Sequence, residues 1–249
     1  MNKTVIEIRN LCIEYGQHTA VRNLSLSVRC GEVYGFVGPN GAGKSSTIRA
    51  LLGFNRIAGG EISILGVDAR DEAARARLGY LPETPTYYDF LTPVELLDSY
   101  ARLFGMSADD RRIRIAELLA QVGLADHAKK RIGKFSKGMQ QRLGLAQAML
   151  NDPELLILDE PASGLDPLGR QKIRQLIESM KARGRTVFFS SHELSEIETV
   201  CDRVGMLVDG ELKVEGEPGM LSGKHGVSLE RVFINLAQGT NAEVTENER

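Results

Sequence analysis

The chain has 249 residues, of which 42% are hydrophobic and 26% are charged, and its formal net charge is −2 at pH 7. This length suits one large α/β domain or two small ones, and the composition excludes a disordered or fibrous chain. The near-neutral charge gives no general attraction to polyphosphate backbones, so nucleic acid is not expected as a partner.

Membrane and secretion signals are absent from the sequence pattern. No apolar stretch approaches the roughly 18 to 20 residues needed to cross a bilayer, and residues 1–10 lack the features of a signal peptide. A soluble, cytoplasmic protein is therefore expected. Cys12, Cys30 and Cys201 are odd in number and far apart, which argues against a disulfide framework and against a zinc site.

The first part of the chain has the pattern of strands. Alternating apolar and polar residues predict short antiparallel strands at 5–8, 11–15 and 20–28. A compact apolar strand at 32–37 then runs into a glycine-rich segment. Helical spacing follows over 45–53, with Gly53 as the C-terminal cap.

Further along, the spacing of the apolar residues changes. From about 91 to 150 it has the period of a helix, which predicts a separate helical lobe. After Pro153 strands and helices alternate, and this pattern predicts a mostly parallel sheet covered on both faces. These elements are a strand at 155–158, a helix at 167–182, a strand at 186–189 and a helix at 193–200. Beyond Gly210 we expect a small hairpin, a looser segment containing 228–236, and a disordered tail over 239–249.

The glycine-rich segment matches the phosphate-binding pattern GxxxxGK[ST]. It consists of Gly38, Pro39, Asn40, Gly41, Ala42, Gly43, Lys44 and Ser45. Because it lies between a predicted strand and a predicted helix, its backbone N–H groups and the helix N-terminus can surround phosphates. Lys44 would reach the β- and γ-phosphates of ATP, and the Ser45 hydroxyl would bind Mg²⁺.

A second motif follows the apolar strand at 155–158. Asp159 and Glu160 come directly after it, and parallel sheets bind ligands at the carboxyl ends of their strands. Asp159 is therefore predicted to bind Mg²⁺, and Glu160 to act as the general base that polarises the attacking water. Alone, two acids after a strand could simply face solvent, but together with the phosphate loop they indicate an ATPase.

The segment Phe135 to Leu143 reads FSKGMQQRL and resembles the signature of ABC-transporter ATPases, LSGGQ followed by a helix. Ser136 suits a helix N-cap, and the Gly138 backbone allows a ligand to approach closely. A capped helix start without a ligand would explain these residues equally well, but their position shortly before Asp159 matches the family. The resemblance implies that Ser136, Lys137, Gly138 and Met139 contact a nucleotide held by another copy.

The resemblance covers nearly all of residues 5–216, and other site residues follow from it. Tyr15 corresponds to the adenine-stacking aromatic, although it could also pack within its strand, and Ser46 extends the ATP-binding set. His192, after Ser190 and Ser191, corresponds to the catalytic switch histidine. The dimer-interface loop corresponds to Ser163, Gly164, Leu165 and Asp166. His18, His127 and His225 are expected to be structural.

Two departures from the family pattern are informative. Glu83 stands where the family usually has a glutamine. Its carboxylate could still bind Mg²⁺ and sense the nucleotide, with an altered coupling between ATP hydrolysis and transport. Lys137 replaces a signature glycine, and its ammonium could lie near the partner-bound nucleotide or face solvent. Together with the sequence over 229–233, these departures resemble the branch that powers ABC-2-type exporters.

The resemblance implies a P-loop NTPase core with a mostly parallel sheet, an N-terminal antiparallel β-subdomain and an inserted α-helical subdomain. We expect an ABC ATPase domain at 1–220, with the helical insertion at about 85–150, and a C-terminal extension at 221–249. The expected protein is a homodimer with two ATP and Mg²⁺ sites, peripheral to the membrane through a separate multi-span permease that docks near Glu83 to Tyr100. A soluble ABC-type ATPase acting on ribosomes or DNA, and a phosphoryl-transferring kinase, are the alternatives.

Overall fold

The protein is described by a computed structural model that covers residues 3–225 and 228–238. The described strands form two sheets, with strand orders β2-β1-β4-β5 and β10-β9-β3-β8-β7-β6. The first sheet contains β1 (Thr4–Tyr15), β2 (His18–Arg29), β4 (Gly59–Ile64) and β5 (Val67–Asp68). The second contains β3 (Val33–Val37), β6 (Leu78–Leu81), β7 (Leu155–Leu158), β8 (Thr186–Ser191), β9 (Arg203–Val208) and β10 (Glu211–Gly216).

The antiparallel sheet differs from the expectation in strand length. Instead of several short strands, β1 and β2 are two continuous strands of 12 residues each. The register of β1 shifts between Ile8 and Leu11, where Asn10 has a positive φ of 48°. This irregularity breaks the alternation of apolar residues, and for that reason the sequence pattern suggested two strands.

The central sheet is parallel from β6 to β9, and β10 pairs antiparallel with β9. All four residues of β7 are apolar and buried because both faces of this sheet are covered. Leu156 and Leu158 pack into a core shared with the helices after β6, whereas Leu155 and Ile157 pack into a second core. The second core also contains residues of α1 (Lys44–Leu51) and the antiparallel sheet.

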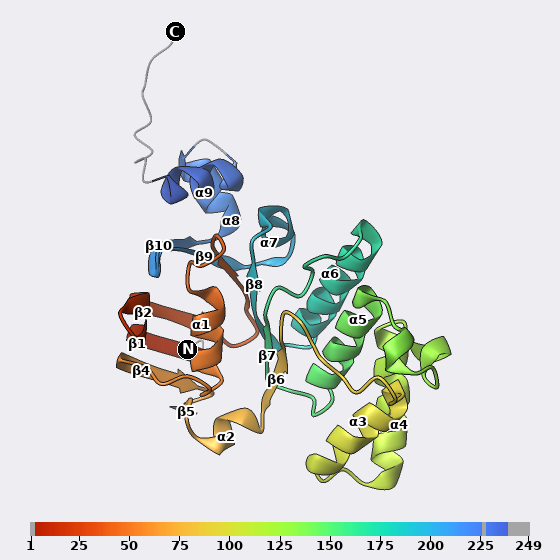
Figure 1. Ribbon diagram of the computed structural model, residues 1–249. Helices are drawn as coiled ribbons and strands as arrows, with labels where there is room; N and C mark the ends of the chain where they lie inside the picture. Colours follow the sequence, from red (N-terminus) through yellow and green to blue (C-terminus); the bar gives the residue numbers. More distant parts are fainter. Residues whose placement is uncertain (1–2, 226–227, 239–249) are drawn as a thin grey trace.

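Helices flank the central sheet on both faces. Figure 1 shows α1 between the antiparallel sheet and the central sheet, with α3 to α6 on the other side. The other helices are α2 (Glu72–Arg75), α3 (Pro93–Leu103), α4 (Ala108–Gln121), α5 (Lys137–Ala148), α6 (Pro167–Ala182), α7 (Leu194–Val200), α8 (Pro218–His225) and α9 (Leu229–Ala237). This α/β architecture, with an antiparallel N-terminal sheet, confirms the predicted fold class.

Local sequence explains where several helices begin. Thr92 and Glu95 form a capping box at the start of α3, and Ser136 caps α5 by accepting a hydrogen bond from the Met139 N–H. The strand at 155–158 and the helix at 167–182 have the predicted bounds. The predicted helical period over 91–150 corresponds to α3, α4 and α5, joined by two short 3-10 turns.

The C-terminal part requires two corrections. The predicted looser segment over 228–236 is helix α9, which Ser228 caps and which packs against α8, α7 and β9. Its apolar residues Leu229, Val232, Phe233 and Leu236 have helical spacing, so the signal was present in the sequence. The hairpin is formed by β9 and β10 around Gly210 rather than beyond it. The predicted disordered tail at 239–249 lies outside the described residues.

None of the helices within residues 3–225 and 228–238 is both long enough and apolar enough to cross a membrane.

Candidate functional site

The candidate site lies where four neighbouring parallel strands end. β3, β6, β7 and β8 run in the same direction, so the residues that follow them meet at one edge of the sheet. A cleft of about 560 Å³ opens there. Its lining contains Tyr15, Pro39, Asn40, Gly41, Gly43, Lys44, Ser45, Ser46, Glu83, Glu160, Ser163 and His192 from the predicted set, and also His18 and Ala20.

The glycines of the phosphate loop are required by close backbone contacts. Gly43 has a φ of 104°, and a Cβ at this position would lie 2.5 Å from the carbonyl oxygen of Ala20. A Cβ at Gly38 would lie 2.4 Å from the carbonyl oxygen of Leu207. Side chains are therefore excluded at both positions, and α1 begins directly after Gly43.

Lys44 is buried at the floor of the cleft, with 6% of its surface exposed. Its Nζ donates hydrogen bonds to the carbonyl oxygens of Gly38 at 2.7 Å and Pro39 at 3.3 Å. It also lies 3.3 Å from Oε1 of Glu160. The ammonium is thus held inside the phosphate loop by two carbonyl groups and one carboxylate, where an anionic ligand would meet it.

Asp159 connects the phosphate loop to β8. Its Oδ1 accepts hydrogen bonds from the Ser190 hydroxyl at 2.7 Å and the Ser45 hydroxyl at 3.4 Å. Ser190 also accepts a hydrogen bond from the backbone N–H of Glu160 at 2.9 Å. Ser190 is fully buried and fixes both acids, a role that the sequence analysis did not assign.

Glu160 has a strained backbone and two charged neighbours. Its φ of 49° lies in the left-handed region, which a non-glycine residue rarely adopts, and such residues are frequent at functional sites. Oε2 lies 2.7 Å from Nδ1 of His192, and Oε1 faces Lys44. The two oxygens therefore bridge the phosphate loop and the segment after β8.

The acids of the site also affect Tyr80 on β6. Burial, followed by the charge of Asp159, raises the pKa of Tyr80 to about 12, and Glu83 acts in the same direction. Arg49 opposes this shift. Tyr80 consequently stays neutral beside these carboxylates at physiological pH.

Tyr15 is 47% exposed at the rim of the cleft. Its hydroxyl accepts a hydrogen bond from Nδ2 of Asn55 at 2.6 Å and donates one to the Ser46 hydroxyl at 3.4 Å. Asn55 also donates to the carbonyl oxygen of Ser46 at 3.4 Å. These contacts anchor the ring at its polar end and leave part of it exposed.

Comparison with known proteins identifies the family. Residues 21–163 match the sequence profile of the ABC transporter family. An uncharacterized ABC transporter ATP-binding protein of Nostoc sp. is 50% identical over 206 residues, which cover 82% of this chain and 62% of the relative. A fluoroquinolones export ATP-binding protein of Mycobacterium tuberculosis is 42% identical, and the match covers 86% of this chain and 71% of the relative. The chain belongs to the ABC transporter family of ATP-binding proteins.

Solved structures agree with this membership. An ATP-binding subunit of an ABC transporter superposes with a TM-score of 0.85 at 32% identity, covering 93% of this chain and 99% of that one. A dimeric, post-hydrolysis ATP-binding cassette bound to ADP and Pi superposes with a TM-score of 0.78 at 25% identity, covering 85% and 98%. ATP-binding domains of this ABC family hydrolyse ATP.

In this ABC protein the signature segment is not part of the cleft lining. Ser136, Lys137, Gly138 and Met139 lie at the start of α5, where Lys137 and Gly138 face the loop at 163–166 instead. A Cβ at Gly138 would lie 3.4 Å from Cδ2 of Leu165, and one at Gly164 would lie 2.6 Å from Nζ of Lys137. The chain therefore brings the signature against its own loop and not against its own phosphate loop.

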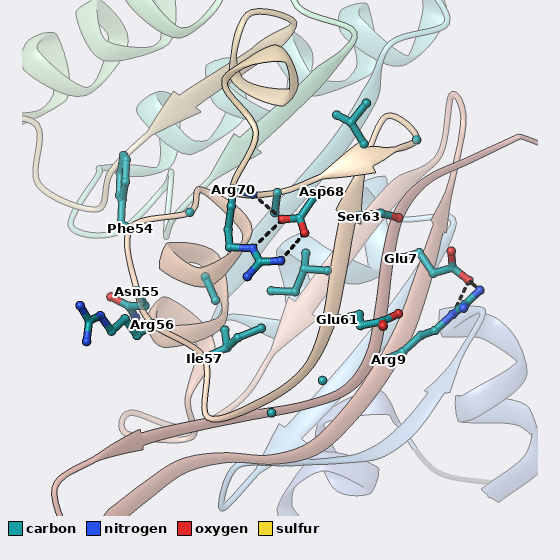
Figure 2. A pocket seen from close by; sticks show the side chains of 18 residues that line it. Glu7, Arg9, Phe54, Asn55, Arg56, Ile57, Glu61, Ser63, Asp68 and Arg70 are labelled. Carbon is teal, nitrogen blue, oxygen red and sulfur yellow. Dashed lines mark hydrogen bonds and ion pairs between the residues drawn. The ribbon is translucent and has the colours of Figure 1, made fainter.

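A larger hollow, of about 800 Å³, lies between the chain after α1, β4 and β5 (Figure 2). Two of its arginines pair with acids of the same hollow, Arg70 with Asp68 and Arg9 with Glu7. None of the predicted site residues lines it. The smaller cleft, where the loop amides, Lys44 and Glu160 meet, is therefore the candidate nucleotide site of this ABC protein.

Proposed function

We propose that the chain is the ATP-hydrolysing subunit of an exporter and that two copies close around two ATP molecules to drive a separate membrane permease. The observation that carries this proposal is the meeting of Lys44, Ser45, Glu160 and His192 in one cleft. A kinase built on the same loop would need an acceptor site and would leave the signature segment without a role.

Within the cleft, the chain's own groups would bind and orient ATP. The loop N–H groups and Lys44 would hold the phosphates, and Tyr15 would contact the adenine. Glu160 would accept a proton from the attacking water, since its Oε1 and Oε2 lie at the carboxyl end of β7 beside Lys44 and His192. His192 would contact the γ-phosphate and keep Glu160 oriented.

The side-chain oxygens of the cleft fit an Mg²⁺ ion that would be bound jointly by the protein and the phosphates of ATP. Mg²⁺ prefers octahedral oxygen ligands at about 2.0–2.1 Å, so adjacent ligands lie about 3 Å apart. Ser45 Oγ and Asp159 Oδ1 are 3.4 Å apart, and Glu83 lines the same cleft. In the described part of the chain no group of three or more acidic, histidine or cysteine side chains could hold a metal, so phosphate oxygens would complete the shell. The ion would neutralise developing phosphate charge.

The second half of each ATP site would come from another copy. The signature segment does not line the cleft of its own chain, which supports a role for Ser136 and Gly138 at the nucleotide of another copy. A head-to-tail homodimer with two-fold symmetry would place each signature against the partner's phosphate loop. The dimeric state of the superposable cassette supports this arrangement.

A docking surface for the permease is proposed at 83–100. Tyr88 and Phe90 are 70% and 65% exposed, and their ring centroids lie 5.6 Å apart. Neighbouring exposed aromatic side chains offer apolar surface that a protein partner could cover. Export is supported by the name of the mycobacterial relative, and the ABC-2 type by the departures at Glu83 and Lys137.

The proposed organisation follows from these roles. Residues 1–220 would form the ATPase domain, with the helical part at about 85–150 carrying both the docking surface and the signature. Residues 221–249 would form an extension beyond it. The protein would lie at the cytoplasmic face of the membrane through its permease.

Affinity purification of the tagged chain from gently solubilised membranes tests this function. We expect a multi-span permease to co-purify and the complex to hydrolyse ATP. The double variant Tyr88→Ser/Phe90→Ser should lose the permease but retain ATP binding, whereas Leu168→Ser, at another exposed apolar side chain, should retain both. Recovery with ribosomes or DNA in place of a permease would refute the exporter assignment.

A further inference from the structure

Arg170, on α6, joins two segments that reach the cleft from different strands. Its Nε donates a hydrogen bond to the carbonyl oxygen of Leu165 at 3.1 Å. Its Nη1 pairs with the carboxylate of Glu193, the residue directly after His192. One guanidinium thus contacts both the 163–166 loop and the segment that carries His192.

The 163–166 loop is also held from its other side. Leu165 packs against Gly138 at the start of α5, and Lys137 lies directly on Gly164. Ser163, at the beginning of the loop, lines the ATP cleft. A continuous set of contacts therefore runs from the signature segment through Leu165 and Arg170 to Glu193.

The same set of contacts ends at the reactive groups. Glu193 is covalently adjacent to His192, and its N–H donates to the Ser191 hydroxyl at 2.9 Å. Nδ1 of His192 lies 2.7 Å from Glu160 Oε2. If the 163–166 loop moved and carried Arg170 with it, the position of His192 relative to Glu160 would consequently change.

Stability alone is a poor explanation for this bridge. The Arg170 and Glu193 side chains are 34% and 26% exposed, and ion pairs exposed to solvent contribute little to folding. A planar guanidinium with several fixed donors is well suited to hold two partners in one geometry. Arg170 and Arg174, one turn apart on α6, both line a small cavity beside Ala162 and Phe189, so Arg174 offers a control arginine in the same surroundings.

We propose that Arg170 is a positioning residue that transmits the position of the 163–166 loop to His192, which rests on the proposed role of the chain as an ATPase. A second copy that presses on the loop would act through Arg170 and Glu193 to set His192 against Glu160. Arg170 contacts no reacting atom in this scheme. It supplies the mechanical link between the dimer surface and the hydrolytic groups.

Steady-state ATPase measurements on Arg170→Ala, with Arg174→Ala as the matched control, test the proposal. We expect Arg170→Ala to lower kcat about 10-fold or more, because small misplacements of catalytic groups have effects of up to about 100-fold. KM for ATP should stay within about two-fold of the wild-type value, and the thermal midpoint should be nearly unchanged. Arg174→Ala should preserve kcat.

Two further variants separate positioning from folding. Arg170→Lys keeps the charge but cannot reach both partners as a fork, so kcat should recover only in part. Glu193→Gln should lower kcat, and the double variant Arg170→Ala/Glu193→Gln should be no slower than Arg170→Ala alone. If the losses of kcat in the two single variants simply added up in the double variant, Arg170 and Glu193 would not act through the same contact.

The ring signals of His192 provide a readout that does not require turnover. The chain has four histidines, so His192→Gln assigns its signals in a heteronuclear NMR spectrum. Arg170→Ala should shift them and Arg174→Ala should not. An unshifted His192 signal with an unchanged kcat would refute the positioning role while leaving the ATPase assignment intact. Failure of the wild-type chain to bind ATP would instead refute the proposed function, and the ring signals would still decide the role of Arg170.

Discussion

Glu160 holds His192 and Lys44 at the same time, with Oε2 2.7 Å from Nδ1 of the histidine and Oε1 3.3 Å from the ammonium. Its backbone is kept in the left-handed region, while Ser190 accepts its N–H hydrogen bond. A single carboxylate therefore joins the phosphate loop after β3 to the segment after β8. A substitution that keeps the shape of the Glu160 side chain but removes its charge therefore distinguishes two roles of this residue, which are to orient His192 and Lys44 and to accept a proton from water.

Glu160→Gln should retain ATP binding, abolish turnover and trap an ATP-bound dimer. The amide keeps one acceptor oxygen but is a very weak base, so water is no longer activated. Turnover should fall by about 100-fold or more, in the range typical of a lost general base. Gel filtration with Mg-ATP and a phosphate-release assay measure the two effects.

Glu154→Gln serves as the matched control for this substitution. Glu154 precedes β7 at the opposite end of the strand and pairs with Arg77 at the surface. It should leave both dimerisation and turnover unchanged. A Glu160→Gln protein that turns over at the wild-type rate would remove Glu160 from its role as base.

Lys44→Ala should weaken ATP binding. The ammonium is buried in the phosphate loop, and a hydrogen bond to a charged group contributes about 1.5–3 kcal/mol, or about 10- to 100-fold in Kd. Titration with a fluorescent ATP analogue measures the change. Lys129→Ala, at an exposed position, is the control, and equal affinities in the two variants would contradict the role of Lys44.

The sequence predicted those parts of the candidate site that form continuous motifs directly after predicted strands. The phosphate loop and Asp159 with Glu160 follow buried strands, and parallel pairing alone brings them together. Ser190 could not be assigned because its bonds to Asp159 and Glu160 connect residues 30 or more positions apart. The available signal was a pair of serines, Ser190 and Ser191, at the end of the strand β8.

The contacts of Asn55 and Arg170 were equally inaccessible. Each depends on which side chains the loops bring together, and no sequence period encodes this. Helix α9 is a different case, because its apolar residues have helical spacing although a looser segment is expected there. Periodicity would have been the better guide there.

Glu83→Ala should lower the ATPase rate with a smaller effect on ATP affinity, because Glu83 lines the cleft but is not one of the residues of the phosphate loop. Glu83→Gln, which restores the residue usual in the family, should keep most of the activity. The dependence of the rate on Mg²⁺ concentration should shift to higher values in Glu83→Ala. If both ATPase rate and transport are unaffected by Glu83→Ala, Glu83 has no sensing role.

Glu196→Gln should stabilise the protein at neutral pH but not at low pH. Burial raises the pKa of Glu196 above its usual value, and Glu193 adds to this shift, whereas Arg170 and Arg174 oppose it. Oε1 has no hydrogen-bond partner among the described residues, so the charged form is poorly solvated in the folded state. Because the pKa of Glu196 is higher in the folded state than in the unfolded state, the carboxyl of the unfolded chain loses its proton first as pH rises. The free energy of unfolding therefore falls as pH rises from about 4.3, the ordinary pKa of a glutamate, through the pKa of the folded state.

Thermal unfolding of Glu196→Gln and the wild-type chain at pH 4 and pH 7.5 measures this penalty. At pH 7.5 the variant should unfold at a higher temperature than the wild-type chain, because the poorly solvated charge is removed from the folded state. At pH 4 the Glu196 carboxyl is mostly protonated in both the folded and the unfolded state, so the difference should be much smaller. Glu198→Gln, at an exposed position of the same helix, should change neither midpoint. A gain for Glu196→Gln that is equal at both pH values would show that the amide improves packing, and that the buried charge is not the source of the instability.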